Sequence, residues 1–111
     1  MTKKIEYVKV DEKGSGGVPA FPSGLVAVVQ KTVIAGELPA LIVIHDDEGD
    51  WLVGDGVNDP NEDGACGLYH MDHVVALDEA IQEAARLRTG YTATRDSLLD
   101  SWVFSKWEYP D

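Results

Sequence analysis

The spacing of the apolar residues changes near residue 70, and the two spacings require two kinds of secondary structure. Residues 25–34, 41–45 and 51–53 are short apolar runs rich in β-branched side chains, which favour strands. Beyond Met71 the apolar residues recur at intervals of three and four, which places them on one face of a helix. They are Val74, Leu77, Ile81, Ala84 and Leu87. The sequence therefore predicts several strands followed by helix.

Turn residues separate the strands. Gly36 and Glu37 follow a strand with a bulge near Gln30, so we expect the first two runs to form a hairpin. The acidic residues 46–50 form the next turn, which gives an antiparallel meander. Further strands are predicted at residues 91–95 and 102–107, joined by a turn at 98–101.

The expected fold is α+β: a mostly antiparallel sheet of four to six strands with one or two helices, at about residues 70–88, packed on one face. Asp72 and Asp78 are both suited to cap a helix N-terminus, so two short helices are an alternative to one. A chain of 111 residues favours a single domain. Within it, residues 1–23 are expected to form a loosely attached strand, at 5–10, and a loop rich in Gly and Pro.

The charge of the chain is concentrated in one stretch. The net charge is −11, and residues 45–64 contain eight Asp or Glu and no Lys or Arg. This balance argues against binding to nucleic acid or to an anionic membrane, because both need cations to neutralise phosphate. It favours a basic protein partner, although a solvated hairpin tip is the plainer interpretation of the same residues. The candidate partner-binding residues are Asp46, Asp47, Glu48, Asp50, Trp51 and Asp55.

Two groups of residues have the chemistry of metal ligands. The first group, at residues 59–63 and followed by Gly64, matches the first half of a calcium-binding loop. The twelfth position of that loop is His70, where a bidentate Glu is needed. The second group, at residues 66–73, would present a thiolate and two imidazoles on one face of a helix. Ordinary turn and helix-start residues are the structural alternative in both cases. The two groups are Asp59, Asn61 and Asp63, and Cys66, His70 and His73.

No catalytic residue and no cofactor are predicted. The carboxylates around Cys66 oppose formation of a thiolate, and the acidic residues of the turn share one solvated environment rather than the contrasting ones that acid and base catalysis needs. Because Cys66 is the only cysteine, no intrachain disulfide is expected. The N-terminus lacks the apolar segment of a signal peptide, and no apolar run reaches the roughly 20 residues of a membrane span. A cytoplasmic location is therefore expected.

One longer pattern resembles a known group of proteins. An apolar strand leads into residues 45–51, HDDEGDW, a loop rich in Gly and Asp follows, and residues 68–70, LYH, open a helix that reaches Asp78. This pattern, over residues 25 to about 102, resembles small uncharacterised bacterial proteins classed as domains of unknown function. Some of their relatives are similar to immunity proteins of bacterial toxin systems. The resemblance implies a non-catalytic inhibitor of a basic toxin, and it carries over no catalytic residues.

Overall fold

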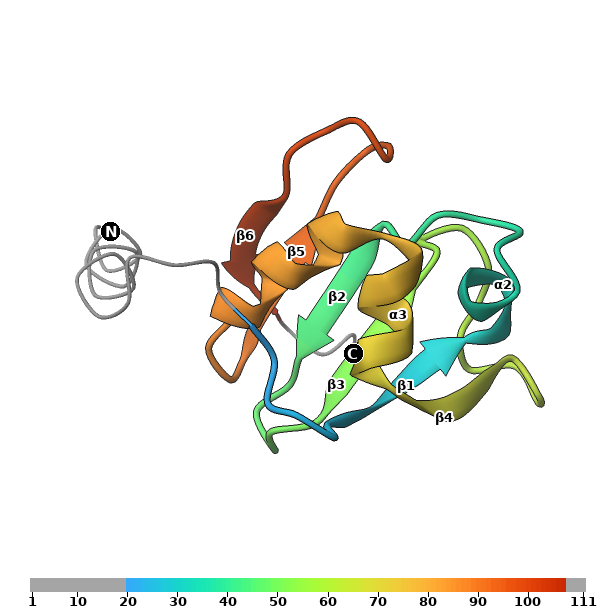
Figure 1. The fold of residues 1–111 in the computed structure, drawn as a ribbon, viewed down its shortest axis with the longest axis horizontal. Coiled ribbons are helices and arrows are strands. Elements are labelled where there is room, and N and C mark those ends of the chain that lie inside the picture. Colours follow the sequence, from blue (N-terminus) through green and yellow to red (C-terminus); the bar gives the residue numbers. More distant parts are fainter. Residues whose placement is uncertain (1–19, 108–111) are drawn as a thin grey trace.

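Six strands form one sheet in the order β4-β1-β3-β2-β5-β6. The computed structural model describes residues 20–107 (Figure 1), so the strand predicted at residues 5–10 lies outside the described residues. The strands are β1 (Val26–Gln30), β2 (Ile42–His45), β3 (Trp51–Gly54), β4 (Cys66–His70), β5 (Tyr91–Thr94) and β6 (Val103–Lys106). The helical segments are α2 (Lys31–Ile34), α3 (Met71–Leu77) and the 3₁₀ helix η1 (Glu79–Arg86). The predicted α+β class is confirmed.

The order of the strands differs from the predicted meander. The hairpin between β2 and β3, closed by residues 46–50, is confirmed, but the hairpin expected between β1 and β2 is wrong. Strand β3 lies between them and pairs with β1 in parallel, while every other neighbouring pair is antiparallel. The reason is local: the predicted strand at 25–34 ends at Gln30, and Lys31–Ile34 form the helical turn α2. That turn carries the chain away from β1 before β2 begins.

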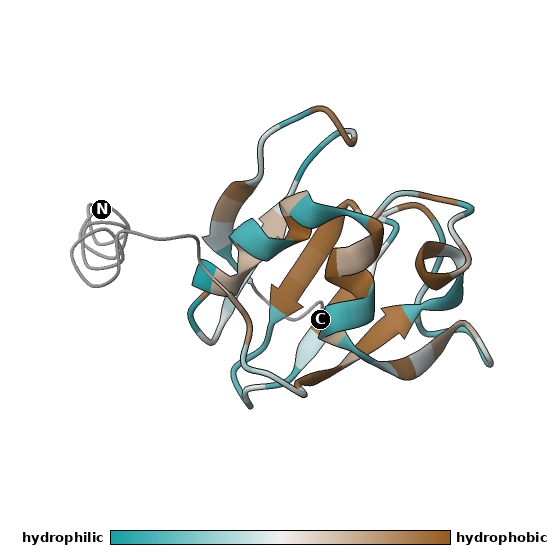
Figure 2. Cartoon of the chain, viewed as in Figure 1, coloured by the Kyte–Doolittle hydropathy of each residue, from teal (hydrophilic) through white to brown (hydrophobic). Residues whose placement is uncertain are grey.

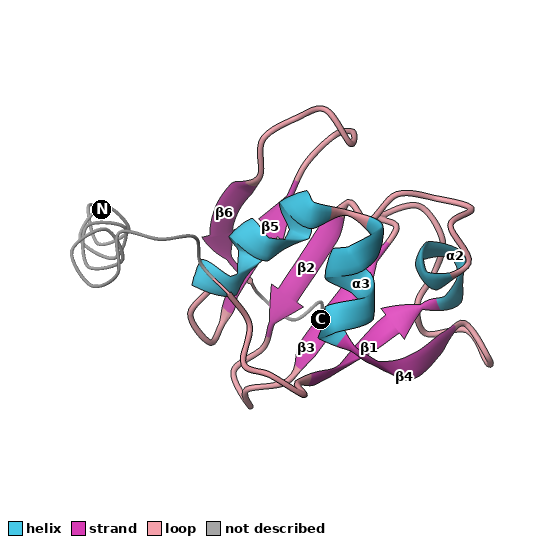
Figure 3. Cartoon of the chain, viewed as in Figure 1, coloured by secondary structure: helices cyan, strands magenta, loops and turns pink. Residues whose placement is uncertain are grey.

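The helical region after β4 consists of two short helices, α3 and η1, which is one of the two alternatives that the sequence predicts. The side chain of Asp78 caps η1 by accepting a hydrogen bond from the backbone N–H of Ala80 at 3.1 Å. Asp72 is not a cap, because it lies in the first turn of α3, whose N-cap is His70. Both helical segments lie on one face of the sheet (Figures 1 and 3). Within residues 20–107, no helix has the length and apolar character needed to cross a membrane.

Strand β4 is the strand of the sheet that the sequence did not predict. The pattern of the sequence has residues 68–70 open a helix, yet residues 66–70 pair with the whole of β1, with Gln30 opposite Cys66 and Val26 opposite His70. The pairing satisfies the backbone of β1 on the side away from β3. Gly67 leaves room there for the ring of Tyr69, because a Cβ at this position would lie 3.0 Å from a ring carbon.

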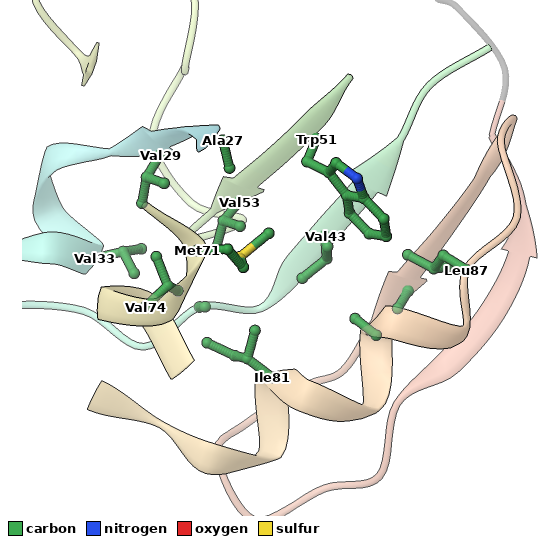
Figure 4. Close-up of a cluster of buried hydrophobic side chains, with 13 residues drawn as sticks. Ala27, Val29, Val33, Val43, Trp51, Val53, Met71, Val74, Ile81 and Leu87 are labelled. Atoms are coloured by element: carbon green, nitrogen blue, oxygen red, sulfur yellow. The ribbon is translucent and has the colours of Figure 1, made fainter. Parts of the chain in front are cut away.

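The core lies between the sheet and the two helical segments (Figure 4). Side chains alternate along each strand, so every second residue points toward the helices. The registers place Val29, Val53, Val43 and Ala93 side by side across four strands, and all four are completely buried. Figure 2 shows the hydrophobic residues along β1 and β2 beneath the helices. The other large contributors are Met71, Val74, Ile81, Leu87 and Trp51.

Candidate functional site

The predicted acidic surface is divided between the two ends of β3. Residues 46–50 form the turn before this strand, and residues 55–63 belong to the loop after it (Figure 1). Strand β3 puts five residue steps between residues 50 and 55, which is roughly 16 Å at about 3.3 Å per residue. The eight acidic residues of this stretch therefore do not form one continuous patch.

The turn at residues 46–50 is held in shape by Asp46. One carboxylate oxygen of Asp46, Oδ1, accepts hydrogen bonds from the backbone N–H groups of Glu48 at 3.0 Å and Asp50 at 2.9 Å. The backbone N–H of Asp46 also donates to the carbonyl oxygen of Asp50 at 2.9 Å, and Gly49 adopts the positive φ of 90° that closes the turn. Asp47, Glu48 and Asp50 are exposed. Their charges therefore project from a turn of fixed backbone geometry.

Trp51 and Asp55, the other two candidate partner-binding residues, are buried. The indole of Trp51 is 7% exposed, stacks on the ring of His45 with centroids 3.8 Å apart, and meets the edge of Phe21 at 5.0 Å. The Nδ1–H of His45 in turn donates to the carbonyl oxygen of Leu87 at 2.9 Å. Both rings of the stack therefore join β2 and β3 to the end of the helical region and are not presented to a partner.

Asp55 is the centre of a buried polar network. Its Oδ1 accepts from the backbone N–H groups of Val57 and Asn58, both at 2.8 Å. Its Oδ2 accepts from the hydroxyl of Thr32 at 2.6 Å and from the side-chain amide of Asn58 at 3.0 Å. Burial raises the pKa of Asp55, but these hydrogen bonds outweigh burial and lower it to about 2. Since all four interactions are made within the protein, the carboxylate fixes the β3–β4 loop.

The same network surrounds the single cysteine. Gln30, which pairs with Cys66 across β1 and β4, accepts the backbone N–H of Asp55 at 2.6 Å and donates to the carbonyl oxygen of Asn58 at 3.2 Å. The thiol of Cys66 lies 3.4 Å from the carbonyl oxygen of Pro60. Burial and the charge of Asp55 raise the pKa of Cys66, opposed by Lys31. The raised pKa keeps the thiol protonated at neutral pH, which makes it a weak nucleophile and a weak metal ligand.

The two predicted sets of metal ligands are not brought together. Cys66 and His70 lie at opposite ends of β4, roughly 13 Å apart along the strand. The rings of His70 and His73 are close, with centroids 6.1 Å apart. In the acidic loop, Oδ1 of Asp59 accepts the backbone N–H of Asn61 at 2.9 Å, and the loop joins two strands where a calcium loop joins two helices.

No group of three or more His, Cys, Asp or Glu side chains in the described part of the chain could hold a metal ion. Asp63, the third residue of the predicted calcium-binding group, lies in the same exposed loop as Asp59.

A surface that the sequence did not predict lies on the side of the sheet opposite α3 and η1, and we call it the open face. Leu68, on the edge strand β4, is 73% exposed there, and Val26, on β1, is 46% exposed. Leu68 lies beside Val28, which lies beside Leu52, which lies beside Ile44. The four aliphatic side chains form a row across β4, β1, β3 and β2. We call this row together with Val26 the apolar strip.

The acidic turn continues the same alternation. Asp46 and Asp50 are two residues from Ile44 and Leu52, and their backbones are paired, so they occupy the next positions of the open face. The apolar strip and the acidic turn are therefore adjacent parts of one surface. The sequence does contain a signal for this surface, because β1 and β2 are continuous apolar runs. A strand with only one buried face would instead alternate apolar and polar residues.

Comparisons of this chain with protein-family models, with curated proteins and with solved structures found no match.

Proposed function

We propose that this protein is a non-catalytic protein-binding module that uses the turn at residues 46–50 to meet a basic protein partner. The observation that supports it is the fixed display of Glu48 and Asp50 by the two hydrogen bonds to Asp46. A turn whose backbone is already ordered loses little conformational entropy when a partner binds. Charges of opposite sign on the partner raise the rate of association and select against acidic proteins.

The surroundings of the turn support the same proposal. Residues 32–85 contain thirteen Asp or Glu and no Lys or Arg, so β2, β3, β4 and their connections have no cation of their own to compete with a basic partner. The apolar strip beside the turn adds the second component of a protein interface, which combines an apolar centre with a polar rim.

An immunity-type inhibitor of a basic toxin is the class of binding module that we favour. The resemblance of residues 25–102 to small bacterial proteins with immunity-like relatives supports this choice, and so does the sign of the charge. A toxin that acts on nucleic acid carries cations for the phosphates of its substrate. An acidic turn would compete with that substrate for the same cations.

The test begins with affinity capture by the full chain from cells that produce it, at low and at moderate salt. A captured protein is then purified, and its association rate with the wild type is compared with its rate with Glu48→Lys/Asp50→Lys. The matched control, Glu79→Lys/Glu83→Lys, reverses two exposed acids on η1 instead. We expect the turn variant to slow association at least about tenfold at low salt, and the control to change it much less.

The proposal fails if both double variants slow association equally, or if the rate of the wild type does not depend on salt. Equal effects would mean that the partner senses the net charge alone. Absence of salt dependence would mean that charge has no part in the encounter.

A further inference from the structure

We propose that the apolar strip of the open face binds the apolar side of a basic amphipathic helix from the partner. This inference rests on the proposed function and adds the second half of the interface to it. The acidic turn would meet the cations of that helix, and the strip would meet its apolar residues.

The first argument is the apolarity of both faces of the inner strands. A sheet with one solvated face usually alternates apolar and polar residues, whereas strands covered on both faces are continuous apolar runs. Strands β1 (VAVVQ) and β2 (IVIH) are of the second kind. In the part of the chain that the structure describes, α3 and η1 cover one face of these strands. A helix from a partner would supply the second covering layer.

The second argument is the lack of charge on the open face. None of the strand residues that alternate toward it is Asp, Glu, Lys or Arg, although 26% of the chain is charged. They are Val26, Val28, Ile42, Ile44, Leu52, Cys66, Leu68, His70, Thr94, Val103 and Ser105, together with Gln30, Gly54 and Thr92, which are buried. Depletion of charge in the centre of a surface, with charge retained at its edge, is the composition of protein interfaces.

The third argument is the sign of the charge at the edge, which identifies the kind of partner. The acidic turn borders the strip at one end of β3, and the acidic residues of 59–63 follow the other end. A nucleic acid or an anionic membrane would be repelled from this edge. A second copy of a chain with a net charge of −11 would be repelled as well. A partner with Lys or Arg beside its apolar residues would be attracted by the acidic turn through its charge and by the apolar strip through its apolar side chains.

The size of the strip argues for one helix. Its row of four side chains crosses four strands, which spans about 14 Å at about 4.8 Å between strands. Toward β5 and β6 the row ends at Thr92 and Ser105, which are polar. Three turns of helix are about 16 Å long and carry an apolar stripe of similar width. A second sheet would need a larger apolar area.

The experiment uses the full chain and a synthetic 18-residue peptide of Leu and Lys that forms an amphipathic helix. A peptide of the same composition, scrambled so that Leu and Lys do not separate onto two faces, is the control for charge alone. Binding is followed by NMR, which reports both the affinity and the residues that change. We expect the amphipathic peptide to bind more tightly than the scrambled one and to shift the signals of Val28, Leu52 and Leu68.

Two substitutions then separate the strip from the rest of the face. Leu68→Thr removes an exposed aliphatic side chain from the strip, and the β-branched Thr that replaces it favours the strand conformation of β4. Val103→Thr makes a comparable change on β6, where Val103 is 62% exposed and lies outside the strip. We expect Leu68→Thr to weaken binding of the amphipathic peptide about five- to tenfold and Val103→Thr to leave it within about twofold.

Several results would overturn the inference. If the two variants weaken binding equally, or if both peptides bind alike, the strip does not recognise the helix. If light scattering shows that the full chain dimerises and that Leu68→Thr prevents it, the strip binds a second copy. If a soluble paramagnetic probe fails to reach the methyl groups of Leu68 in the full chain, the chain covers the strip itself.

The proposed function has a separate outcome in the same experiment. If Glu48→Lys/Asp50→Lys weakens binding and Leu68→Thr does not, the acidic turn binds a basic partner and the inference about the strip is wrong.

Discussion

Replacing Asp55 by Asn tests whether the buried polar network stabilises the fold as its geometry requires. The carboxylate of Asp55 accepts four hydrogen bonds and is completely buried. An Asn side chain of the same shape keeps one oxygen for the backbone N–H groups of Val57 and Asn58. Its amide would then face the side-chain amide of Asn58, which is also a donor. We expect Asp55→Asn to lower the free energy of unfolding at pH 7 by about 2 kcal/mol.

The dependence of that loss on pH is the sharper part of the prediction. The pKa of Asp55 is lowered from its ordinary value of 3.8 to about 2 in the folded protein, and 1.36 kcal/mol per unit gives about 2 kcal/mol of stabilisation. Because the folded pKa is the lower one, this stabilisation is complete above the unfolded pKa. It is lost as the pH falls through the folded pKa. Roughly half of it remains at pH 3.

The assay is urea unfolding followed by tryptophan fluorescence, at intervals from pH 7 down to pH 3. The quantity of interest is the difference in unfolding free energy between wild type and Asp55→Asn, since the other carboxylates titrate in both proteins and cancel. Asp59→Asn is the control: Asp59 is exposed and its acceptor oxygen is retained, so we expect a loss below about 0.5 kcal/mol. A difference for Asp55→Asn that stays constant from pH 7 to pH 3 would refute the reasoning.

Three further predictions concern neighbouring features. Asp78→Ala should lower the unfolding free energy by about 3 kcal/mol in the same urea assay, because it removes the cap of η1 and leaves the buried guanidinium of Arg95 without its carboxylate; Asp78→Ser, which keeps a cap, should recover part of the loss, and equal losses would contradict this. The thiol of Cys66 should react with iodoacetamide at pH 7.5 more slowly than free cysteine, because its pKa is raised, and faster in Asp55→Asn, where a charge that raises it is gone; a rate unchanged by that substitution would show that Asp55 does not act on the thiol. Addition of zinc or calcium should shift the melting temperature by less than about 1 °C, because Cys66 and His70 lie at opposite ends of β4, and a concentration-dependent rise would disprove it.

The parts of the fold that the sequence predicts are those decided by neighbours along the chain. The hairpin of β2 and β3 follows from the turn at 46–50, and the division of the helical region follows from the capping side chain of Asp78. The position of β3 between β1 and β2 depends instead on distant contacts. The chain leaves β1 where the backbone N–H of Lys31 donates to the carbonyl oxygen of Ala65 at 2.9 Å. No local pattern reports this bond between residues 34 positions apart.

The candidate site divides in the same way. The acidity of residues 45–64 and the strand that divides it are both visible in the sequence, but the burial of Asp55 depends on distant contacts with Gln30 and Thr32 and on the fold of the loop at Asn58. Asp55 would otherwise be grouped with the exposed acids, as the prediction grouped it. The apolar strip needs the register that places Leu68, on an unpredicted strand, beside Val28. Only the paired strands bring these residues to one face.

The acidic turn and the apolar strip would contribute to binding in different ways, and this difference follows from their physics. Charges at an exposed turn act over about a Debye length, roughly 8–10 Å at physiological salt, so they act mainly before contact and change the association rate. Aliphatic side chains act after water has been expelled, so they mainly determine how long the complex lasts. Added salt should therefore slow association in wild type and in Leu68→Thr alike. The faster dissociation of Leu68→Thr should persist at every salt concentration, because burial of its side chain does not depend on screening.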